Sequence, residues 1–414
     1  MKCLDTAVFP KPVSVALCSI LATCVADCAI LTVGNTADNG AGSLRQAIAD
    51  ASEGDQIVFA TNLAGHAIFL TSGELLVSKS LQITGLGAEK IAVARSPLES
   101  VPSFWVFTFM NGTSIVSGLT ISNAVGGVRN ITDLTLENCN ISQNSGAGLS
   151  GRGRMTVQGC AFSRNGGVGI NLSGYGSSAS LINCTIAENA GGGVVHTSDT
   201  GHLSLLNCTV VGNSGSTFMR SVTVALLWQY GSLDLKNTIV AGNTSTDDMG
   251  VGFVTEGANF SSGHNLLGSV ITQRAVGWTD TDLFSVSAEN LKLGALAVSR
   301  GGTPTMVPQK GSPAIDAGDR PGAPETDQRG IKRPNGSGVD IGAAEYTLAE
   351  ATVASNRRIR LNFSGVPDAE YRLQESSDLV SWSSRTNRLP AVQGFVSFEV
   401  EIGDCPRFFR TVAE

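Results

Sequence analysis

The densest cluster of ionisable residues in this chain lies between positions 316 and 340, where Asp316, Asp319, Asp327 and Asp340 accompany Arg329. Several carboxylates close together supply the hard oxygen ligands that Ca²⁺ prefers, so Asp316, Asp319 and Asp340 define a candidate calcium site. No contiguous calcium-binding loop motif accompanies them. The sequence favours the structural alternative, in which Arg329 pairs with aspartates and holds an irregular segment in place.

A second set of candidates is aromatic. Trp228 and Tyr230, with Arg220 nearby, lie in a stretch that is longer than its counterparts in the repeat described below. Aromatic rings stack on the faces of sugars, so these three residues are predicted to bind a glycan. Packing of the same side chains in the core is the alternative.

Signals for catalysis are weaker. His196, Asp199 and His202 lie close together in sequence, in a stretch that indicates a solvated loop rather than a catalytic trio. Glycoside hydrolysis needs two carboxylates at a fixed separation, and uronate cleavage needs a base beside cation-binding acids. Acidic residues in the repeats do not recur at one register position, so neither set is visible.

The elements that must position these residues come from a motif that recurs five times. In each copy apolar residues alternate with polar ones, Cys or Thr follows, and the copy closes on Asn. The closing residues are Asn144, Asn165, Asn189, Asn213 and Asn243, which lie 21, 24, 24 and 30 positions apart. Alternation indicates strands with one buried face, and each repeat is long enough for three short strands. The chain is therefore predicted to form an all-β solenoid, a parallel β-helix.

Equivalent positions stack in such a fold. The closing asparagines are therefore predicted to form a ladder of side-chain amides, and the glycine-rich stretches after them are predicted to supply turn conformations. Cys139, Cys160, Cys184 and Cys208 also share one register position. Their parallel Cβ vectors suit disulfides poorly and their spacing is not that of a metal site, so they are predicted to be small buried core residues.

Residues 1–26 are predicted to form a secretory signal peptide, because Lys2 and Lys11 precede a short uncharged stretch that ends in small residues. A lipoprotein signal ending at Cys24 fits less well, and a buried β segment is the structural alternative. Removal of these residues changes the net charge from −7 to −8. This acidity argues against nucleic acid or an anionic membrane as a partner, and no transmembrane segment is expected in the mature chain.

Residues 27–346 are predicted to form the β-helix domain. It would begin with a short amphipathic helix at 43–51, with Ser43 as N-cap, which covers the open end of the core. It would end in an irregular cap at about 245–346. Residues 347–414 lack the repeat and are predicted to form a small β-sandwich with Trp382 and Phe398 in its core.

Short motifs outside the repeats carry a family resemblance. They are NGAGSLRQAI at 39–48, GHNLLG at 263–268, GGTPT at 301–305, GSPAIDAGD at 311–319, TDQRG at 326–330 and VDIGAAE at 339–345. These motifs resemble secreted bacterial right-handed parallel β-helix proteins of the choice-of-anchor Q type, although Ala344 stands where that family often has an aromatic residue. The resemblance covers about residues 30–346 and implies a pectate-lyase-like solenoid at the cell surface, with a variable anchor and no assigned chemistry.

The stretch 371–382 looks like C-terminal modules of planctomycete and verrucomicrobial secreted proteins, which implies an anchor or sorting role for 347–414. The sequence thus favours a secreted or cell-surface monomer that acts in adhesion or binds an extracellular polysaccharide or cell-envelope component. Neither catalysis nor a cofactor is expected, with Ca²⁺ as the one candidate ion. The alternative is a polysaccharide lyase or glycoside hydrolase. Converging acids and a base would favour the enzyme, and a flat, uncharged face of Asn, Ser and Thr would favour the binding protein.

Overall fold

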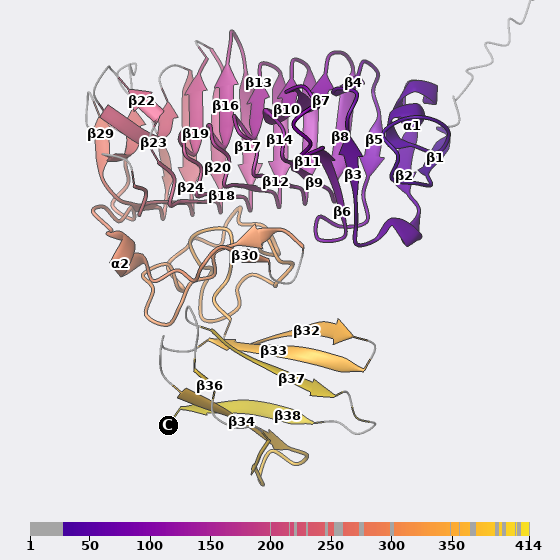
Figure 1. Ribbon diagram of the computed structural model, residues 1–414. Coiled ribbons are helices and arrows are strands. Elements are labelled where there is room, and N and C mark those ends of the chain that lie inside the picture. Colours follow the sequence, from indigo (N-terminus) through magenta and orange to yellow (C-terminus); the bar gives the residue numbers. More distant parts are fainter. Residues whose placement is uncertain are drawn as a thin grey trace, which may run out of the picture.

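In a computed structural model the chain forms a long stack of parallel strands, followed by an irregular segment and two small antiparallel sheets (Figure 1). The structure describes residues 28–198, 200–214, 216–218, 222–228, 231–244, 247–251, 260–272, 277–298, 302–347, 349–355, 357–364, 370–385, 389–390, 395–401, 403 and 407–413. The predicted signal peptide, 1–26, lies outside the described residues. Among the described residues, no helix is long and apolar enough to cross a membrane.

The stack is a parallel β-helix, as predicted, in which successive strands of each rung belong to three different sheets. Sheet A contains β1 (Ile30–Val33), β2 (Gln56–Phe59), β5 (Gln82–Thr84), β8 (Thr113–Ser117), β11 (Asp133–Glu137), β14 (Arg154–Gln158), β17 (Ser178–Ile182), β20 (His202–Leu206), β24 (Ser232–Lys236) and β27 (Ser261–Gly263). Sheet B contains β3 (His66–Leu70), β6 (Ile91–Arg95), β9 (Thr120–Ser122), β12 (Asn140–Ser142), β15 (Ala161–Ser163), β18 (Thr185–Ala187), β21 (Thr209–Val211), β25 (Ile239–Val240) and β28 (Leu266–Leu267). Sheet C contains β4 (Leu75–Val77), β7 (Trp105–Phe109), β10 (Gly126–Asn130), β13 (Leu149–Gly151), β16 (Ile170–Ser173), β19 (Val194–Thr197), β23 (Val222–Trp228), β26 (Asp247–Val251) and β29 (Val270–Thr272), with β22 (Ser216–Phe218) antiparallel to β23.

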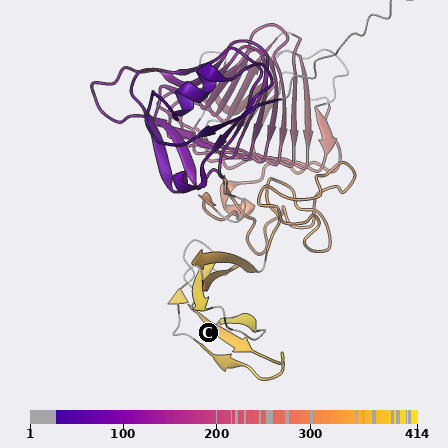
Figure 2. The ribbon, with the colours of Figure 1, turned by 90° about the vertical axis from the view of Figure 1, so that its right-hand side faces the viewer.

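Alternation along each strand produces the core. In β11, Leu134 and Leu136 are buried, whereas the residues between and beside them are half-buried on the outer face. Leu136 lies in register with Val157, and Val157 with Leu181 on the next strand. Apolar residues at equivalent positions therefore stack into continuous rows inside the solenoid. Figure 2 shows the strands of successive rungs lying side by side.

The closing asparagines form a ladder at the turn after sheet B. Each side-chain Nδ2 donates to the Oδ1 of the next member at 2.9–3.0 Å, in the order Asn144, Asn165, Asn189, Asn213 and Asn243. The same Oδ1 atoms accept the backbone N–H of the preceding asparagine. Because the four members from Asn144 to Asn213 are fully buried, these bonds satisfy polar groups that water does not reach.

The four cysteines of the repeat are free thiols with no exposed surface. The Sγ of Cys184 lies 3.4 Å from the carbonyl oxygen of Val157, and that of Cys208 lies 3.4 Å from Leu181 O. Burial raises the pKa of the Cys160 and Cys208 thiols well above the ordinary value. Cys139, Cys160, Cys184 and Cys208 are therefore small buried residues that fill a row of the core, as predicted.

The predicted turn role of the glycine-rich stretches holds for Gly192 and Gly212, whose φ values are 117° and 71°, but was wrong for residues such as Gly146 and Gly166. Neither has a positive φ; instead, a Cβ at Gly146 would lie 2.4 Å from Val125 O, and one at Gly166 would lie 2.4 Å from Ser145 O. Glycine is needed there because neighbouring rungs approach each other closely. Left-handed backbone occurs earlier in each copy, for example at Gln143, where φ is 57°.

Both ends of the solenoid are covered. Helix α1 (Leu44–Asp50) closes the first rung as predicted, and Ser43 Oγ accepts the N–H of Gln46 as an N-cap at 3.1 Å. A short 3₁₀ helix, η1 (Thr61–Leu63), follows β2. At the other end Trp278 contacts two phenylalanine rings, Phe260 and Phe284, with centroid distances of 5.9 and 5.4 Å. Regular strands continue to β29, so the irregular segment is shorter than the predicted 245–346.

The irregular cap, residues 277–347, lies along the outer face of sheet B (Figures 1 and 2). It contains α2 (Ala288–Leu291) and the short strands β30 (Ala297–Val298) and β31 (Pro304–Thr305). Leu291, Ala314 and Ile341 from the cap pack against Ile239 and Leu266 on the solenoid. Because small and apolar residues meet there, a second hydrophobic core forms outside the β-helix.

The C-terminal module consists of two small antiparallel sheets. One contains β32 (Ala349–Ser355), β33 (Arg358–Ser364) and β37 (Phe395–Glu401); the other contains β34 (Glu370–Ser376), β35 (Ser383–Ser384), β36 (Leu389–Pro390) and β38 (Phe408–Ala413). Phe398 is buried in the core as predicted. The prediction for Trp382 was wrong: its ring is half-buried outside that core, and Arg410 Cζ lies 4.2 Å from the ring centroid.

Candidate functional site

The predicted aromatic site falls largely outside the described residues. Arg220 and Tyr230 are both outside them. Trp228 is the last residue of β23, and its backbone pairs with His196 of β19 and Val251 of β26. A glycan site at Arg220, Trp228 and Tyr230 therefore stays a prediction.

The three aspartates of the predicted calcium site lie in the cap, each with partners of its own. Asp319 forms an ion pair with Lys236 at 2.8 Å. One Asp340 oxygen accepts the N–H of Asp316 at 2.7 Å, and Asp316 Oδ1 accepts the N–H of Gly338 at 2.7 Å. Among the described residues, no three His, Cys, Asp or Glu side chains are arranged to hold a metal ion. The structure therefore does not bring these carboxylates together as a set of ligands.

Two buried ion pairs hold the cap instead. Arg329 pairs with Asp327 at 2.8 Å, and Arg333 pairs with Glu345 at 2.5 Å, with all four side chains inaccessible to solvent. The first pair matches the structural alternative to the calcium site. Sequence reasoning missed the second pair, because neither residue recurs in a pattern that would mark it.

The histidines of the 196–202 stretch lie in different environments. His196 is fully buried, with Nε2 3.1 Å from Ser177 O, whereas His202 is exposed, with Nδ1 2.7 Å from Ser232 Oγ. Asp199 lies outside the described residues. The predicted solvated loop was wrong for both residues, because His196 lies in β19 and His202 is the first residue of β20, although His202 is exposed as predicted.

The outer face of sheet A carries a row of hydroxyl side chains across four successive rungs. The members are in register on β11, β14, β17 and β20: Thr135, Thr156, Ser180 and Ser204. All four are exposed or half-buried, because they alternate with buried residues along their strands. Parallel strands lie about 4.8 Å apart, so groups that both donate and accept hydrogen bonds repeat at that spacing. We call these four residues the hydroxyl row.

Acidic side chains on this face lie beside the row or at its end. Asp133 and Glu137 flank Thr135 on β11, four residues and about 13 Å apart in an extended strand. Asp234 lies in register with Ser204 on β24, four strands and roughly 19 Å from β11. Glycosidases hold their two carboxyl groups about 5 to 9.5 Å apart. By their backbone positions, these three acids lie farther apart than this range.

The corner between sheet A and sheet B binds the cap through asparagine side chains. Asn183 donates from Nδ2 to Thr326 O at 2.8 Å. Asn237 donates to Asp319 O at 2.8 Å and accepts the Asp319 N–H at 2.8 Å. Asn207 occupies the same corner position and donates to two further cap carbonyls at 3.3 and 3.4 Å. These amides therefore recognise the peptide groups of an irregular chain.

The sequence contains a signal for this row of asparagines, beside the closing asparagines of the repeat. Asn138, Asn183, Asn207 and Asn237 each directly precede the Cys or Thr position of the repeat. All four have φ of 50–51°, the left-handed conformation that Asn adopts more readily than most residues. An asparagine repeated at a corner thus predicts both the turn and a row of outward amides.

A polar cleft of about 640 Å³ opens where the cap leaves this corner. Its lining includes the loop 85–90, the corner residues Gly118, Asn138 and Gly159, and the cap residues 326–330. No aromatic residue lines it, and most of the lining is polar backbone or side chain. The lining also includes the final, outward-facing residues of two sheet A strands, Ser117 and Gln158. The cleft therefore lies next to the outer face of sheet A.

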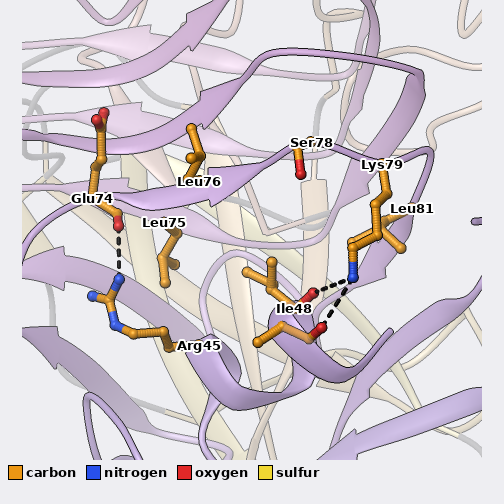
Figure 3. Close-up of a pocket in the computed structure, with 9 residues that line it drawn as sticks. Arg45, Ile48, Glu74, Leu75, Leu76, Ser78, Lys79 and Leu81 are labelled. Carbon is orange, nitrogen blue, oxygen red and sulfur yellow. Dashed lines mark hydrogen bonds between the residues drawn. The ribbon is translucent and has the colours of Figure 1, made fainter. Parts of the chain in front are cut away.

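A smaller pocket of about 240 Å³ lies between α1 and the residues 74–81 (Figure 3). Arg45 donates to Glu74 O at 2.7 Å, and Lys79 Nζ donates to Ala49 O at 3.0 Å and to the carbonyls of Ile48 and Ala51. An ammonium at the carbonyl end of a helix is favourable. The polar groups of this pocket thus fasten the capping helix to the first rungs.

Comparison with known proteins supports the fold. The family model for right-handed β-helix regions matches residues 108–266. Pectate lyase Pel9A is similar in structure, with a TM-score of 0.52 and 16% identity over 77% of this chain and 96% of that one. ORF18 of Geobacillus virus E2 gives a TM-score of 0.39 at 10% identity, over 92% and 76% of the two chains. The PL6 family alginate lyase AlyGC gives 0.23 at 10% identity, over 79% and 60%. The comparison with curated proteins finds no match.

Proposed function

We propose that this protein binds an extracellular polysaccharide without cleaving it, as an adhesion or glycan-binding protein of the cell surface or the secreted fraction. The observation that carries the proposal is the hydroxyl row on the outer face of sheet A. Hydroxyl groups donate and accept hydrogen bonds, as sugar hydroxyls do. Their regular spacing suits a linear polymer laid across the rungs.

The spacing of acidic residues supports the non-catalytic half of the proposal. Asp133 and Glu137 are too far apart for glycoside hydrolysis, and Asp234 is farther from both. Lys236, the basic side chain near Asp234, is already paired with Asp319 of the cap. The fold is shared with a pectate lyase, so a polysaccharide ligand suits it, but the fold likeness transfers no chemistry.

Co-sedimentation with insoluble polysaccharides, combined with assay of the supernatant for oligosaccharides, tests both halves. Ser180→Arg places a bulky charge in the middle of the hydroxyl row and should abolish sedimentation. The matched control is Asn171→Arg on β16, the strand before β17, since Asn171 is half-buried on the outer face of sheet C. Release of oligosaccharides by the wild type would refute the non-catalytic half, and equal binding by the two variants would refute the site.

The predicted aromatic residues allow a second arm of the same experiment. Trp228→Ala combined with Tyr230→Ala should weaken sedimentation while leaving the fold intact, because stacking on sugar faces would be lost. Unchanged sedimentation of this double variant would refute the aromatic site. It would not test the hydroxyl row, which Ser180→Arg tests separately.

A further inference from the structure

Asn138 is an unused member of the corner row that holds the cap. It has the same position in the repeat and the same φ, 51°, as Asn183 and Asn207. Those two residues and Asn237 donate to carbonyl oxygens of the cap. Asn138 is exposed, and its side-chain amide makes no hydrogen bond to any described residue. A group that recognises amides three times elsewhere in the row is therefore free at this position.

The free amide faces the polar cleft. Asn138, Gln158 and Ser117 all contribute to its lining, so a side-chain hydroxyl and a second amide lie on the same wall. The adjacent corner residues are Gly118 and Gly159, which leave space beside Asn138. A Cβ at Gly159 would lie only 2.3 Å from Asn138 Oδ1, so glycine there is what permits the observed position of the amide.

We propose that this cleft binds an N-acetylated saccharide, with the acetamido group paired to the Asn138 side chain as the peptide group of Asp319 is paired to Asn237. In that pairing Nδ2 donates to a carbonyl oxygen and Oδ1 accepts an N–H, both at 2.8 Å. An acetamido substituent is a secondary amide and presents the same donor and acceptor. The sugar hydroxyls then meet Ser117, Gln158 and the Lys90–Glu89 pair at the rim.

The lining favours a saccharide over an extended polypeptide. A peptide strand presents an amide about every 3.3 Å, so it needs a partner at almost every step. The cleft offers one such corner amide, because Gly118 and Gly159 have no side chain and Asn183 is occupied by Thr326. A sugar that carries one amide among several hydroxyls matches this set better. The site is separate from the hydroxyl row and does not depend on it.

Calorimetry with the full chain and soluble trisaccharides tests the assignment. Triacetylchitotriose should bind, and chitotriose, which lacks only the acetyl groups, should bind about tenfold or more weakly, a difference of about 1.4 kcal/mol. The Asn138→Gly variant should bind the acetylated trisaccharide more weakly by the same factor. Glycine should keep the left-handed backbone, since Gly159 already occupies this corner in the next rung. The control is Asn123→Gly, because Asn123 is also exposed and left-handed, with φ of 60°, at a different corner.

Each outcome decides the proposal. Equal affinity for the acetylated and deacetylated trisaccharides would overturn recognition of the acetamido group. If Asn138→Gly and Asn123→Gly lose the same affinity for triacetylchitotriose, or if neither loses any, the site is overturned. Tighter binding of pentaalanine than of triacetylchitotriose, lost in Asn138→Gly, would show that the cleft takes a polypeptide instead. Ser180→Arg should leave trisaccharide binding unchanged, so failure of the hydroxyl row and failure of the cleft are distinguishable.

Discussion

Asp248 terminates the asparagine ladder: its Oδ1 accepts both the backbone N–H and the side-chain Nδ2 of Asn243, each at 2.8 Å. The row that begins with the four cysteines ends in the same way. Beyond Thr238 it continues to Asn265, whose N–H and Nδ2 both donate to Asp282 Oδ1, at 3.1 and 2.9 Å. An ionised carboxylate only accepts hydrogen bonds, so it satisfies the last two donors without requiring a further rung.

Replacement of Asp248 should therefore destabilise the solenoid from its C-terminal end. Asp248→Leu leaves two donors of Asn243 without an acceptor, and we expect a loss of about 1–3 kcal/mol in the free energy of unfolding. The Asp248→Asn variant keeps one acceptor oxygen, so its free energy of unfolding should fall by less. Chemical denaturation followed by circular dichroism measures both; equal stability of the leucine variant and the wild type contradicts the terminator role.

The interior of the ladder gives a second prediction. Asn189→Leu removes a fully buried member, so the amide of Asn165 loses its acceptor and Asn213 loses its donor. Exposed Asn39 is the control for the same substitution. We expect the Asn189 variant to be less stable than the Asn39 variant by about 1–3 kcal/mol. Indistinguishable melting temperatures would argue against a stabilising ladder.

The repeat made most of this architecture predictable, because each row of the solenoid repeats one residue type at one position. The repeat alone assigns Asn144 to Asn243 and Cys139 to Cys208 to two stacked rows. Residues that occur once lacked that support. Asp248 and Asp282 look like ordinary turn aspartates in the sequence, and their role follows only from the geometry of the last rungs.

The candidate sites were harder to predict for the same reason. Asp316, Asp319 and Asp340 are near one another in sequence, and proximity suggested shared chemistry. In an irregular segment, sequence distance says little about where a side chain points, and each carboxylate found a separate partner. Asn138 belongs to the repeat, but the sequence does not show which corner residues the cap covers, and this decides whether the Asn138 amide is paired.

Chelation gives a third prediction. Asp319 is paired with Lys236, and Asp316 and Asp340 accept backbone N–H groups, so the folded cap has partners for these carboxylates without Ca²⁺. We expect a chelator to leave the melting temperature unchanged. A decrease that added Ca²⁺ reverses would restore the calcium hypothesis, since a ligand that binds only the folded state stabilises it.

The last prediction concerns the pH dependence of stability, through Asp340. Burial raises the pKa of this carboxyl to about 6, because the N–H groups of Asp316 and Tyr346, which favour the charged form, only partly offset the loss of water. In the unfolded chain its pKa is about 3.9. Between these two values the folded state binds more protons, so stability falls as pH rises from about 4 through about 6.

Asp340→Asn isolates this contribution, because asparagine does not titrate. We expect the stability difference between wild type and variant to be larger at pH 5, where the buried carboxyl is largely protonated and neutral, than at pH 8. The change should be about 1.4 kcal/mol, in the direction of relative destabilisation of the wild type at pH 8. Urea denaturation of both proteins at the two pH values measures it, and groups common to both cancel. A difference that does not vary with pH, or that grows at pH 8, would show that Asp340 is ionised in the folded protein throughout this range.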